Sequence, residues 1–323
     1  MRRTLILTAA LAGFAIIVPA LGQAQAYPTR PIKLVVPWSP GGGTDVLARI
    51  IAGKLSEAMG QQVIVENKPG ASSMIGMTAV AQATPDGYTF GLATSNLAAN
   101  PYLYASHSFD VAKDLAPVVL VSKGVYAMAV NPALPVKSVA DLIAHAKANP
   151  GKLNAALVGA GSPPHLALAQ FKSMTGVDIV GIHYKGAGPS MAATVAGETQ
   201  LMFASYATMS PMVQAERLRL LAVTSAKRAT TAPDVPTAVE SGLPGFVFDE
   251  WYAVFAPAKT PRVAIDRFNA EVRKVLALPD VRERMKGLAS EPAGGSPEEL
   301  GEFVRGELAR FSKLIKDNNI KAD

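Results

Sequence analysis

The chain alternates between short apolar runs and longer segments in which apolar residues recur every three to four positions. An early example joins an apolar run over 31–37 to a segment over 45–59, where Leu47, Ile51 and Leu55 share one face. The first pattern predicts a buried strand, and the second predicts an amphipathic helix. The same alternation continues through most of the chain.

The other predicted elements follow these two patterns. We expect strands over residues 63–65, 89–93, 118–121, 125–130, 153–158, 177–184, 200–204, 218–224 and 251–256. We expect helices over residues 74–82, 138–149, 164–175, 189–196, 262–276, 280–288 and 297–316. Strands that alternate with helices imply an α/β fold with mainly parallel sheets that helices cover on both faces.

The first 26 residues have the three parts of a secretory signal peptide. Residues 1–3 form a positive start, residues 5–21 are almost wholly apolar, and Ala24-Gln25-Ala26 supplies the small residues of a cleavage site. The alternative is a transmembrane anchor, but the apolar stretch is short for a span and contains Pro19. We therefore expect export and cleavage after Ala26.

Composition excludes several classes of site. Hydrophobic residues make up 49% of the 323 residues and charged residues 17%, which favours about two domains with large cores. The absence of cysteine excludes disulfides, thiolate metal sites and cysteine nucleophiles. The four histidines have no metal-binding spacing. Without Arg2 and Arg3 the mature chain keeps 29 basic and 25 acidic residues, a net charge of +4 without basic runs, so we expect no nucleic-acid partner.

The most informative loop is Pro37–Asp45, with the sequence PWSPGGGTD, between a predicted strand and a predicted helix. Its three glycines let the backbone turn sharply, and the helix N-terminus offers unpaired N–H groups to an anion. Ligands of doubly wound sheets bind at this end of the strands. The residues alone equally allow a plain turn that packs Trp38 into the core, with Thr44 capping the helix. A Walker A loop is excluded because Thr44-Asp45 follows Gly43.

Three further loops are rich in glycine and hydroxyl residues, at 67–73, 159–165 and 184–189. Together these loops predict a cleft lined by amides and hydroxyls, which suits recognition better than bond breaking. The spacing of Ser162 and His165 leaves open a serine nucleophile with its base. We favour His165 as a helix-start residue that packs or hydrogen-bonds locally.

The loop at 37–45 resembles the first signature of the Bug family, the periplasmic substrate-binding receptors of tripartite tricarboxylate transporters. Residues 67–71 (NKPGA) resemble the second signature, and 85–89, 184–186, 221–225 and 240–245 also match in order. The resemblance implies a two-lobed, type II-like periplasmic binding protein fold with the ligand between the lobes. One lobe would comprise residues 27–127 and 248–323, and the other 128–247.

The resemblance also implies a ligand site without metal, cofactor or catalytic group. Its expected residues are Trp38, Ser39, Gly42, Gly43, Thr44, Asp45, Ser73, Ser162, Lys185, Gly186, Ala187 and Ser205. The implied partners are a small organic carboxylate and the membrane permease subunits of the transporter, and the receptor is expected to be a monomer in the periplasm.

Two departures from the family pattern bear on the ligand. Ala204 and the segment 191–194 stand where family members often carry an acidic residue that could meet an ammonium group. We therefore expect a carboxylate without an amine, either a di- or tricarboxylate or an aromatic acid. Two other functions stay open on the sequence: a sensor receptor for a signalling system, and a secreted α/β hydrolase that uses Ser162 and His165.

Overall fold

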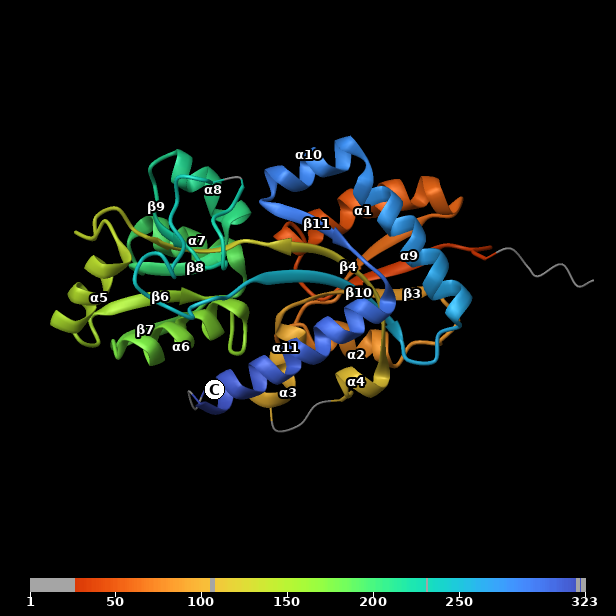
Figure 1. Cartoon of the computed structure of the whole chain (residues 1–323), viewed down its shortest axis with the longest axis horizontal. Coiled ribbons are helices and arrows are strands. Elements are labelled where there is room, and N and C mark those ends of the chain that lie inside the picture. The colour runs from red at the N-terminus through yellow and green to blue at the C-terminus, as the bar shows by residue number, and fades with distance from the viewer. Residues whose placement is uncertain (1–26, 105–107, 231, 318–319, 321–323) are drawn as a thin grey trace, which may run out of the picture.

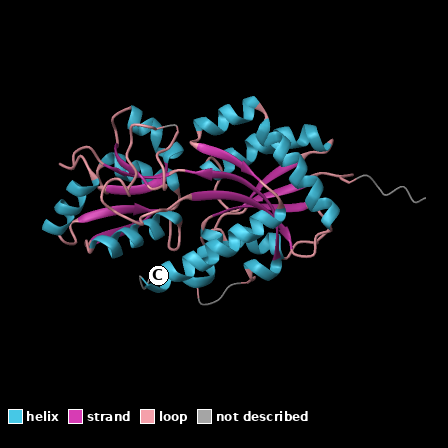
Figure 2. Ribbon diagram, viewed as in Figure 1, coloured by secondary structure: helices cyan, strands magenta, loops and turns pink. Residues whose placement is uncertain are grey.

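The computed structural model describes residues 27–104, 108–230, 232–317 and 320. Two sheets form two lobes, and strands cross between the lobes near the middle of the molecule (Figure 1). Helices lie on both sides of each sheet (Figure 2). The predicted signal peptide, residues 1–26, lies outside the described residues.

The first sheet has six strands in the order β11-β4-β10-β3-β1-β2. Its strands are β1 (Ile32–Val36), β2 (Val63–Asn67), β3 (Thr89–Thr94), β4 (Leu115–Gly124), β10 (Glu250–Pro257) and β11 (Ser290–Gly294). The helices of this lobe are α1 (Gly43–Met59), α2 (Met74–Ala81), α3 (Asn96–Leu103), α4 (Val111–Asp114), α9 (Arg262–Ala277), α10 (Pro279–Gly287) and α11 (Pro297–Asp317).

The second sheet has five strands in the order β7-β6-β8-β5-β9. They are β5 (Tyr126–Val130), β6 (Leu153–Leu157), β7 (Ile179–His183), β8 (Leu201–Ser205) and β9 (Arg219–Val223). Its helices are α5 (Val139–Ala148), α6 (Pro163–Thr175), α7 (Ala187–Ala196) and α8 (Tyr206–Gln214).

The α/β, two-lobed prediction is confirmed, and both sheets are mixed. β1 pairs in parallel with β2 and β3, and β6 with β7 and β8, as expected for strands joined through helices. β10 pairs antiparallel with β3 and β4, β11 with β4, and β5 with β8 and β9. The strands β5 and β10 enter their sheets from the other lobe and not from a covering helix, which explains their reversed direction.

The chain passes between the sheets twice. It leaves the first sheet at Gly124 and enters the second at Tyr126, and it returns between Val223 and Glu250. Thr224 ties the two crossings together, because its hydroxyl lies 3.0 Å from the carbonyl oxygen of Tyr126 and 2.6 Å from that of Phe248. The predicted lobe boundaries stay a prediction, although Tyr126 and Ala127, assigned there to the first lobe, pair in β5 of the second sheet.

Four elements were not predicted: α3, α4, α8 and β11. Pro101 lies inside α3 and Pro211 inside α8, and each interrupts the pattern of a helix. β11 contains Pro292, which the structure tolerates because β11 is an edge strand paired with β4.

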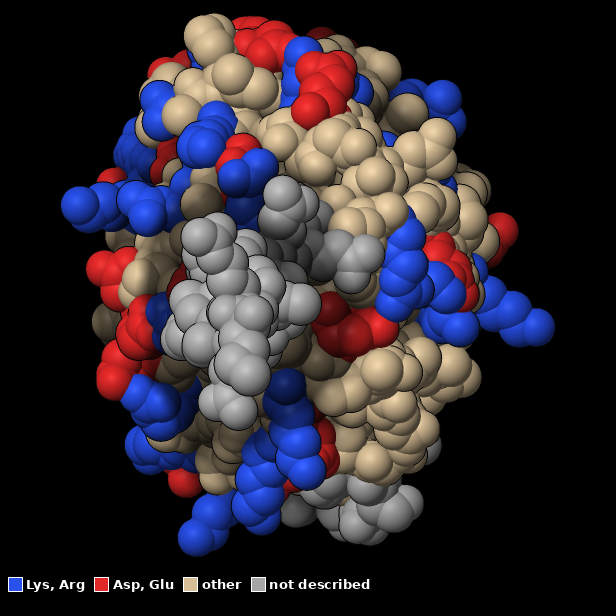
Figure 3. Space-filling model, turned by 90° about the vertical axis from the view of Figure 1, so that its right-hand side faces the viewer, with Lys and Arg blue, Asp and Glu red and all other residues tan. Residues whose placement is uncertain are grey.

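The apolar faces of the helices close the cores. In the first lobe, α1 and α9 pack on the sheet, and the rings of Phe90 and Phe268 stack with their centres 4.0 Å apart. In the second lobe, Phe171 of α6 packs against Phe203 of β8 at 6.1 Å between ring centres. On the molecular face shown in Figure 3, basic and acidic side chains are interspersed.

Candidate functional site

Six helices begin at the carboxyl ends of parallel strands. α1, α2 and α3 follow β1, β2 and β3 of the first sheet, and α6, α7 and α8 follow β6, β7 and β8 of the second. Since β1–β3 run in one direction and β6–β8 do so too, each set of three loops gathers at a single edge. Ligands of open α/β sheets bind beyond such edges.

The two edges face each other. A Cβ atom placed on Gly43 would lie 3.9 Å from the hydroxyl oxygen of Ser205, in the opposite lobe. The hydroxyl of Ser72 donates a hydrogen bond to the carbonyl of Ala160, and the hydroxyl of Tyr104 donates to the same carbonyl at 2.9 Å. Residues that follow β1, β2 and β3 therefore meet a residue that follows β6 and the last residue of β8.

Five of these six helices begin without a side-chain hydrogen bond at their N-cap. The N-cap residues of these helices are Gly42 (α1), Ser73 (α2), Ser95 (α3), Ser162 (α6) and Gly186 (α7). The sixth, α8, is capped by Ser205, whose hydroxyl oxygen accepts from the Thr208 N–H at 3.4 Å. An uncapped helix start leaves backbone N–H donors for another acceptor, and the helix dipole favours an anionic one. The site is therefore suited to carboxylate oxygens.

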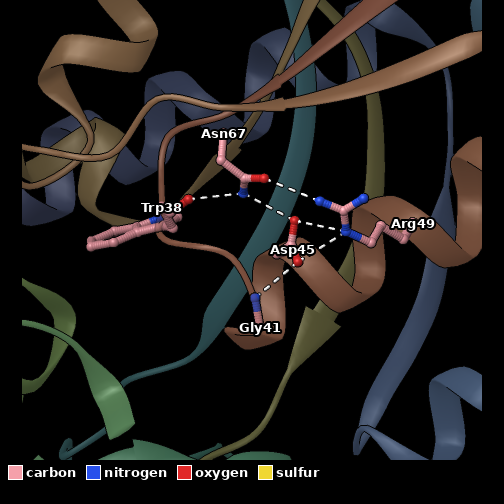
Figure 4. Close-up of polar contacts among 5 residues, drawn as sticks. All are labelled: Trp38, Gly41, Asp45, Arg49 and Asn67. Atoms are coloured by element: carbon pink, nitrogen blue, oxygen red, sulfur yellow. Dashed lines mark hydrogen bonds and ion pairs between the residues drawn. The ribbon is translucent and has the colours of Figure 1, made fainter. Parts of the chain in front are cut away.

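The loop before α1 is held in shape by Asp45 (Figure 4). One carboxylate oxygen of Asp45 accepts from the Gly41 N–H at 2.9 Å and from Arg49 Nε at 3.0 Å, and the other accepts from Asn67 Nδ2 at 2.9 Å. Asn67 Nδ2 also donates to the carbonyl of Trp38 at 3.0 Å. The carboxylate of Asp45 thus fixes the conformation of the loop. The positive charge of Arg49 neutralises the negative charge of Asp45, which would otherwise repel an anion.

The pKa of Asp45 reflects this arrangement. Burial by itself would raise the pKa of this carboxyl, but hydrogen bonds from Arg49, the Gly41 N–H and Asn67 hold it below its usual value. Asp45 is 3% exposed and therefore stays a buried, paired anion.

Replacing Asp45 with asparagine is expected to destabilise the fold by about 1.5–3 kcal/mol, because this buried carboxylate loses its charge-assisted hydrogen bonds with the Gly41 N–H, Arg49 and Asn67. Urea unfolding measures this change. The matched control is Asp86→Asn, which removes a carboxylate from a solvent-exposed pair with Arg30 and should cost about 0–1 kcal/mol. Equal effects of the two substitutions would show that the Asp45 network does not hold the loop.

The loop residues predicted for the site lie together at the start of α1. Gly42 and Gly43 open the helix, Thr44 is buried behind them, and Ser39 is exposed. Trp38 is half-buried, and its indole N–H donates to the hydroxyl of Thr94 at 3.2 Å. The alternative, a turn that packs Trp38 into the core with Thr44 as the cap, is met only in its first part: Trp38 packs against the core of the first lobe, but the N-cap of α1 is Gly42.

The remaining predicted residues start other helices of the two edges. Ser73 is buried, and its hydroxyl oxygen accepts from Asn96 Nδ2 at 2.8 Å. Ser162 is 0% exposed, and its hydroxyl has no hydrogen-bond partner among the described residues. Gly186 and Ala187 begin α7, and Lys185 before them is exposed. Their place at the site follows from the pairing of β7 with β6.

Four residues at the facing edges were missed. The hydroxyl of Tyr252 lies 3.7 Å from the position of a Gly43 Cβ, and Thr208 Oγ1 lies 4.0 Å from it. Ser72 and Tyr104 form the contacts with Ala160 described above. Ser72 lies in the loop 67–73, whose glycine and hydroxyl residues were the signal in the sequence that could have identified it. Tyr252 gives no such signal, because it lies inside a buried strand.

Ser162 and His165 do not form a hydrogen-bonded serine–histidine pair. His165 Nδ1 accepts from the Gly161 N–H at 3.0 Å, and its ring packs edge-on against His183 at 5.5 Å between ring centres. A serine nucleophile needs a hydrogen bond to its base, which Ser162 lacks here. The expected local role of His165 is confirmed. The described ranges contain no cluster of side chains that could hold a metal ion and no helix long and apolar enough to cross a membrane.

Comparisons with known proteins match this architecture. The sequence model of a family described as "Tripartite tricarboxylate transporter family receptor" matches residues 47–320. Protein BugT of Bordetella pertussis is 35% identical over 301 residues, which cover 93% of this chain and 92% of BugT.

Two solved structures of Rhodopseudomonas palustris proteins have the same fold. Rpa4515, solved with adipate, superposes with a TM-score of 0.87 at 37% sequence identity. The match covers 91% of this chain and 99% of the Rpa4515 chain. MatC, solved with bound malate, superposes with a TM-score of 0.84 at 29% sequence identity. The match covers 90% of this chain and 100% of the MatC chain.

Proposed function

Because this chain belongs to the tripartite tricarboxylate transporter receptor (Bug) family, whose members are periplasmic solute-binding proteins, we propose that it captures a small organic carboxylate between its lobes. We further propose that it delivers this ligand to the membrane subunits of a tripartite tricarboxylate-type transporter. The observation that carries the proposal is the row of uncapped helix starts on two edges that face each other.

The energetics require both lobes. Micromolar affinity corresponds to about 8 kcal/mol, whereas a single helix N-terminus contributes about 0.3–1 kcal/mol. Hydrogen bonds to a charged group contribute about 1.5–3 kcal/mol each. Three or four donors, drawn from the start of α1 on one side and from α6, α7 or Ser205 on the other, bring the total into range. The lobes then close on the ligand as a hinge motion.

The ligand class follows from the relatives and from the acids that this chain lacks. Rpa4515 was solved with adipate and MatC with malate, two dicarboxylates without an amine. Ala204 and residues 191–194 of α7 offer no carboxylate to an ammonium group. We therefore propose an amine-free di- or tricarboxylate or an aromatic acid as the ligand. The mature chain, cleaved after Ala26, would act in the periplasm as a monomer.

A thermal-shift screen of the mature protein tests this function. The probes are adipate, malate, citrate, benzoate and succinate, with aspartate as the amine-bearing analogue of succinate. A probe at 100 times its dissociation constant should stabilise the protein by about 2.7 kcal/mol, which raises the melting temperature by several degrees.

We expect the amine-free acids to raise the melting temperature, and Ser162→Ala should keep at least part of the binding. Stabilisation by aspartate but not succinate would contradict the ligand class, and turnover of an ester that Ser162→Ala abolishes would contradict the receptor function.

A further inference from the structure

A buried acid, Glu250, lies next to the candidate site. It begins β10, among the strands that cross between the lobes (Figure 1), and is 7% exposed. Its side chain and that of Tyr252 point to the same face of the sheet, because residues two apart in a strand do so. The two side chains share a hydrogen bond. The hydroxyl of Tyr252 in turn lies 3.7 Å from a Cβ atom placed on Gly43, at the start of α1. A single side chain therefore connects Glu250 to the proposed position of the ligand carboxylate.

Glu250 has few partners for a negative charge. Its Oε2 atom is buried and accepts no hydrogen bond within the described part of the chain. An ionised carboxylate in this position lacks much of the solvation that water provides, so burial favours the neutral acid. Burial raises the pKa of Glu250 to about 7, and the hydrogen bond with Tyr252 offsets only part of this rise. Glu250 therefore changes its charge near neutral pH.

The groups that face Glu250 do not fix its charge. The titratable side chains that interact with it are Tyr252 of its own strand and Tyr126 of β5. Burial and the charge of Glu250 raise the pKa of both hydroxyls well above normal, so both keep their protons. β4 places Gly124 opposite Glu250, and β11 places Ser290 opposite Gly124, so neither strand presents a titratable group at this position.

Charged side chains on the neighbouring elements do not pair with this acid. Lys123 precedes Gly124 and faces the opposite side of the sheet, where its charge acts on Asp249. Glu291 is paired with Lys123 and faces that side too. Arg282 and Lys286 of α10 are exposed to solvent. Among the described residues, no cation therefore lowers the pKa of the acid, which titrates as a single buried group beside two neutral hydroxyls.

The charge of Glu250 decides what Tyr252 can offer to a ligand. An ionised carboxylate only accepts hydrogen bonds, so it holds the single hydroxyl proton of Tyr252. A neutral acid can donate its own proton to the oxygen of Tyr252, which frees the hydroxyl proton for another acceptor. The buried negative charge of the ionised state also repels an anion at the start of α1. Both effects favour a bound carboxylate when Glu250 is protonated.

We propose that Glu250 is a positioning residue for the ligand: a carboxylate binds at the start of α1 together with a proton, which Glu250 holds so that the hydroxyl of Tyr252 donates to the carboxylate. The inference rests on the proposed capture of a carboxylate and adds the dependence on a proton. A ligand that prefers the protonated form takes up a proton on binding. Its affinity therefore falls as pH rises through the pKa of Glu250, about 7.

Titration calorimetry of the mature protein tests this linkage. The probes are adipate, malate, succinate and benzoate, whose own charge stays constant because ordinary carboxyls ionise below pH ~5. Buffers with different heats of ionisation give the number of protons exchanged. For an acid that binds, we expect the affinity to fall at least ~10-fold from pH ~6 to pH ~9, and the complex to take up about 0.5 proton at pH ~7.5. The original protein alone gives this result, so the test does not depend on the folding of a variant.

Three variants separate this role from a structural one. The amide of Glu250→Gln can donate to Tyr252 as the neutral acid does, and it does not titrate. This variant should therefore keep the low-pH affinity throughout, bind ~10-fold more tightly than the original protein at pH ~9, and take up less proton. Tyr252→Phe should bind ~10-fold more weakly at pH ~6 and lose most of the pH dependence. Glu283→Gln makes the same change at an exposed position and should behave as the original protein.

Three results would overturn this inference and leave the receptor function intact. They are binding with constant affinity and no proton uptake, weaker binding by Glu250→Gln at every pH, and full pH dependence in Tyr252→Phe. The absence of binding by all four acids at every pH would instead contradict the proposed function, and the inference would fall with it. The two failures are therefore distinguishable in one set of titrations.

Discussion

Replacing Gly43 with leucine is expected to lower the affinity for a carboxylate ligand by about 100-fold, or about 2.7 kcal/mol. A Cβ atom at Gly43 would lie 3.7 Å from the hydroxyl of Tyr252 and 3.9 Å from that of Ser205. A leucine side chain extends beyond Cβ into the space between the lobes. It therefore separates the start of α1 from Ser205 and blocks the approach of a ligand. Titration calorimetry with the best carboxylate of the screen measures the loss.

Two control variants separate this effect from a change in folding. Gly43→Ala adds only the Cβ atom, whose contacts are ordinary van der Waals distances, so its affinity should stay within about threefold of the original. Gly53→Leu places the same leucine on the exposed face of the same helix, where a Cβ meets nothing within 4 Å. Binding by Gly43→Leu that equals binding by Gly53→Leu would show that the ligand does not lie at this helix start.

The second large effect is a loss of stability with rising pH that depends on Glu250. This residue begins β10 at the hinge and is 7% exposed. Burial raises the pKa of its carboxyl to about 7, although a hydrogen bond from the hydroxyl of Tyr252 opposes the rise. The side chains that face it include Tyr252 and Tyr126 of β5, whose own pKa values are raised well above normal by burial and by Glu250.

The direction of the effect follows from proton uptake. Between the ordinary value of 4.5 and about 7, the folded protein keeps the proton of Glu250 and the unfolded chain has lost it. The free energy of unfolding therefore falls as pH rises through this window, by about 1.4 kcal/mol per pH unit. The total loss is about 3 kcal/mol, after which the slope ends because both states are ionised.

Urea unfolding of the original protein and of Glu250→Gln across this pH window isolates the contribution of Glu250. Glutamine keeps the shape of the side chain and does not titrate, and the other ionisable groups are common to both proteins. We expect the original protein to lose about 3 kcal/mol relative to the variant between pH ~4.5 and pH ~8. A constant difference across this range would show that the pKa of Glu250 is the same in the folded and unfolded states, as it is for an exposed glutamate.

The part of the site that could be predicted from the sequence is the part encoded locally. Three consecutive glycines between an apolar run and an amphipathic helix indicate the start of α1, and the structure places Gly42 and Gly43 there. The loops before α6 and α7 carry a similar local signal. Asp45 was predicted as a ligand residue. In the structure its carboxylate accepts hydrogen bonds from Arg49 and Asn67 and so holds the loop itself, and a single sequence does not reveal the contact with Asn67.

The part that could not be predicted depends on contacts distant in the sequence. Tyr252 approaches Gly43 because β10 returns from the second lobe and inserts beside β3. Its surroundings in the sequence, Glu250 to Pro257, are those of any buried strand. The mixed direction of the sheets has the same origin, since the reversal of β5 and β10 follows from the two crossings between lobes and leaves no local pattern.

The central claim is that opposed helix starts from the two lobes recognise the negative charge of a carboxylate. Titration calorimetry of the mature protein with a carboxylate and its primary amide tests it directly, with adipate and adipamide as one pair and benzoate and benzamide as the other. We predict that at least one acid binds with micromolar affinity and that its amide, which has the same shape without the charge, binds at least ~100-fold more weakly. An amide that binds as tightly as its acid, or the absence of binding by every acid of the screen, would contradict the claim.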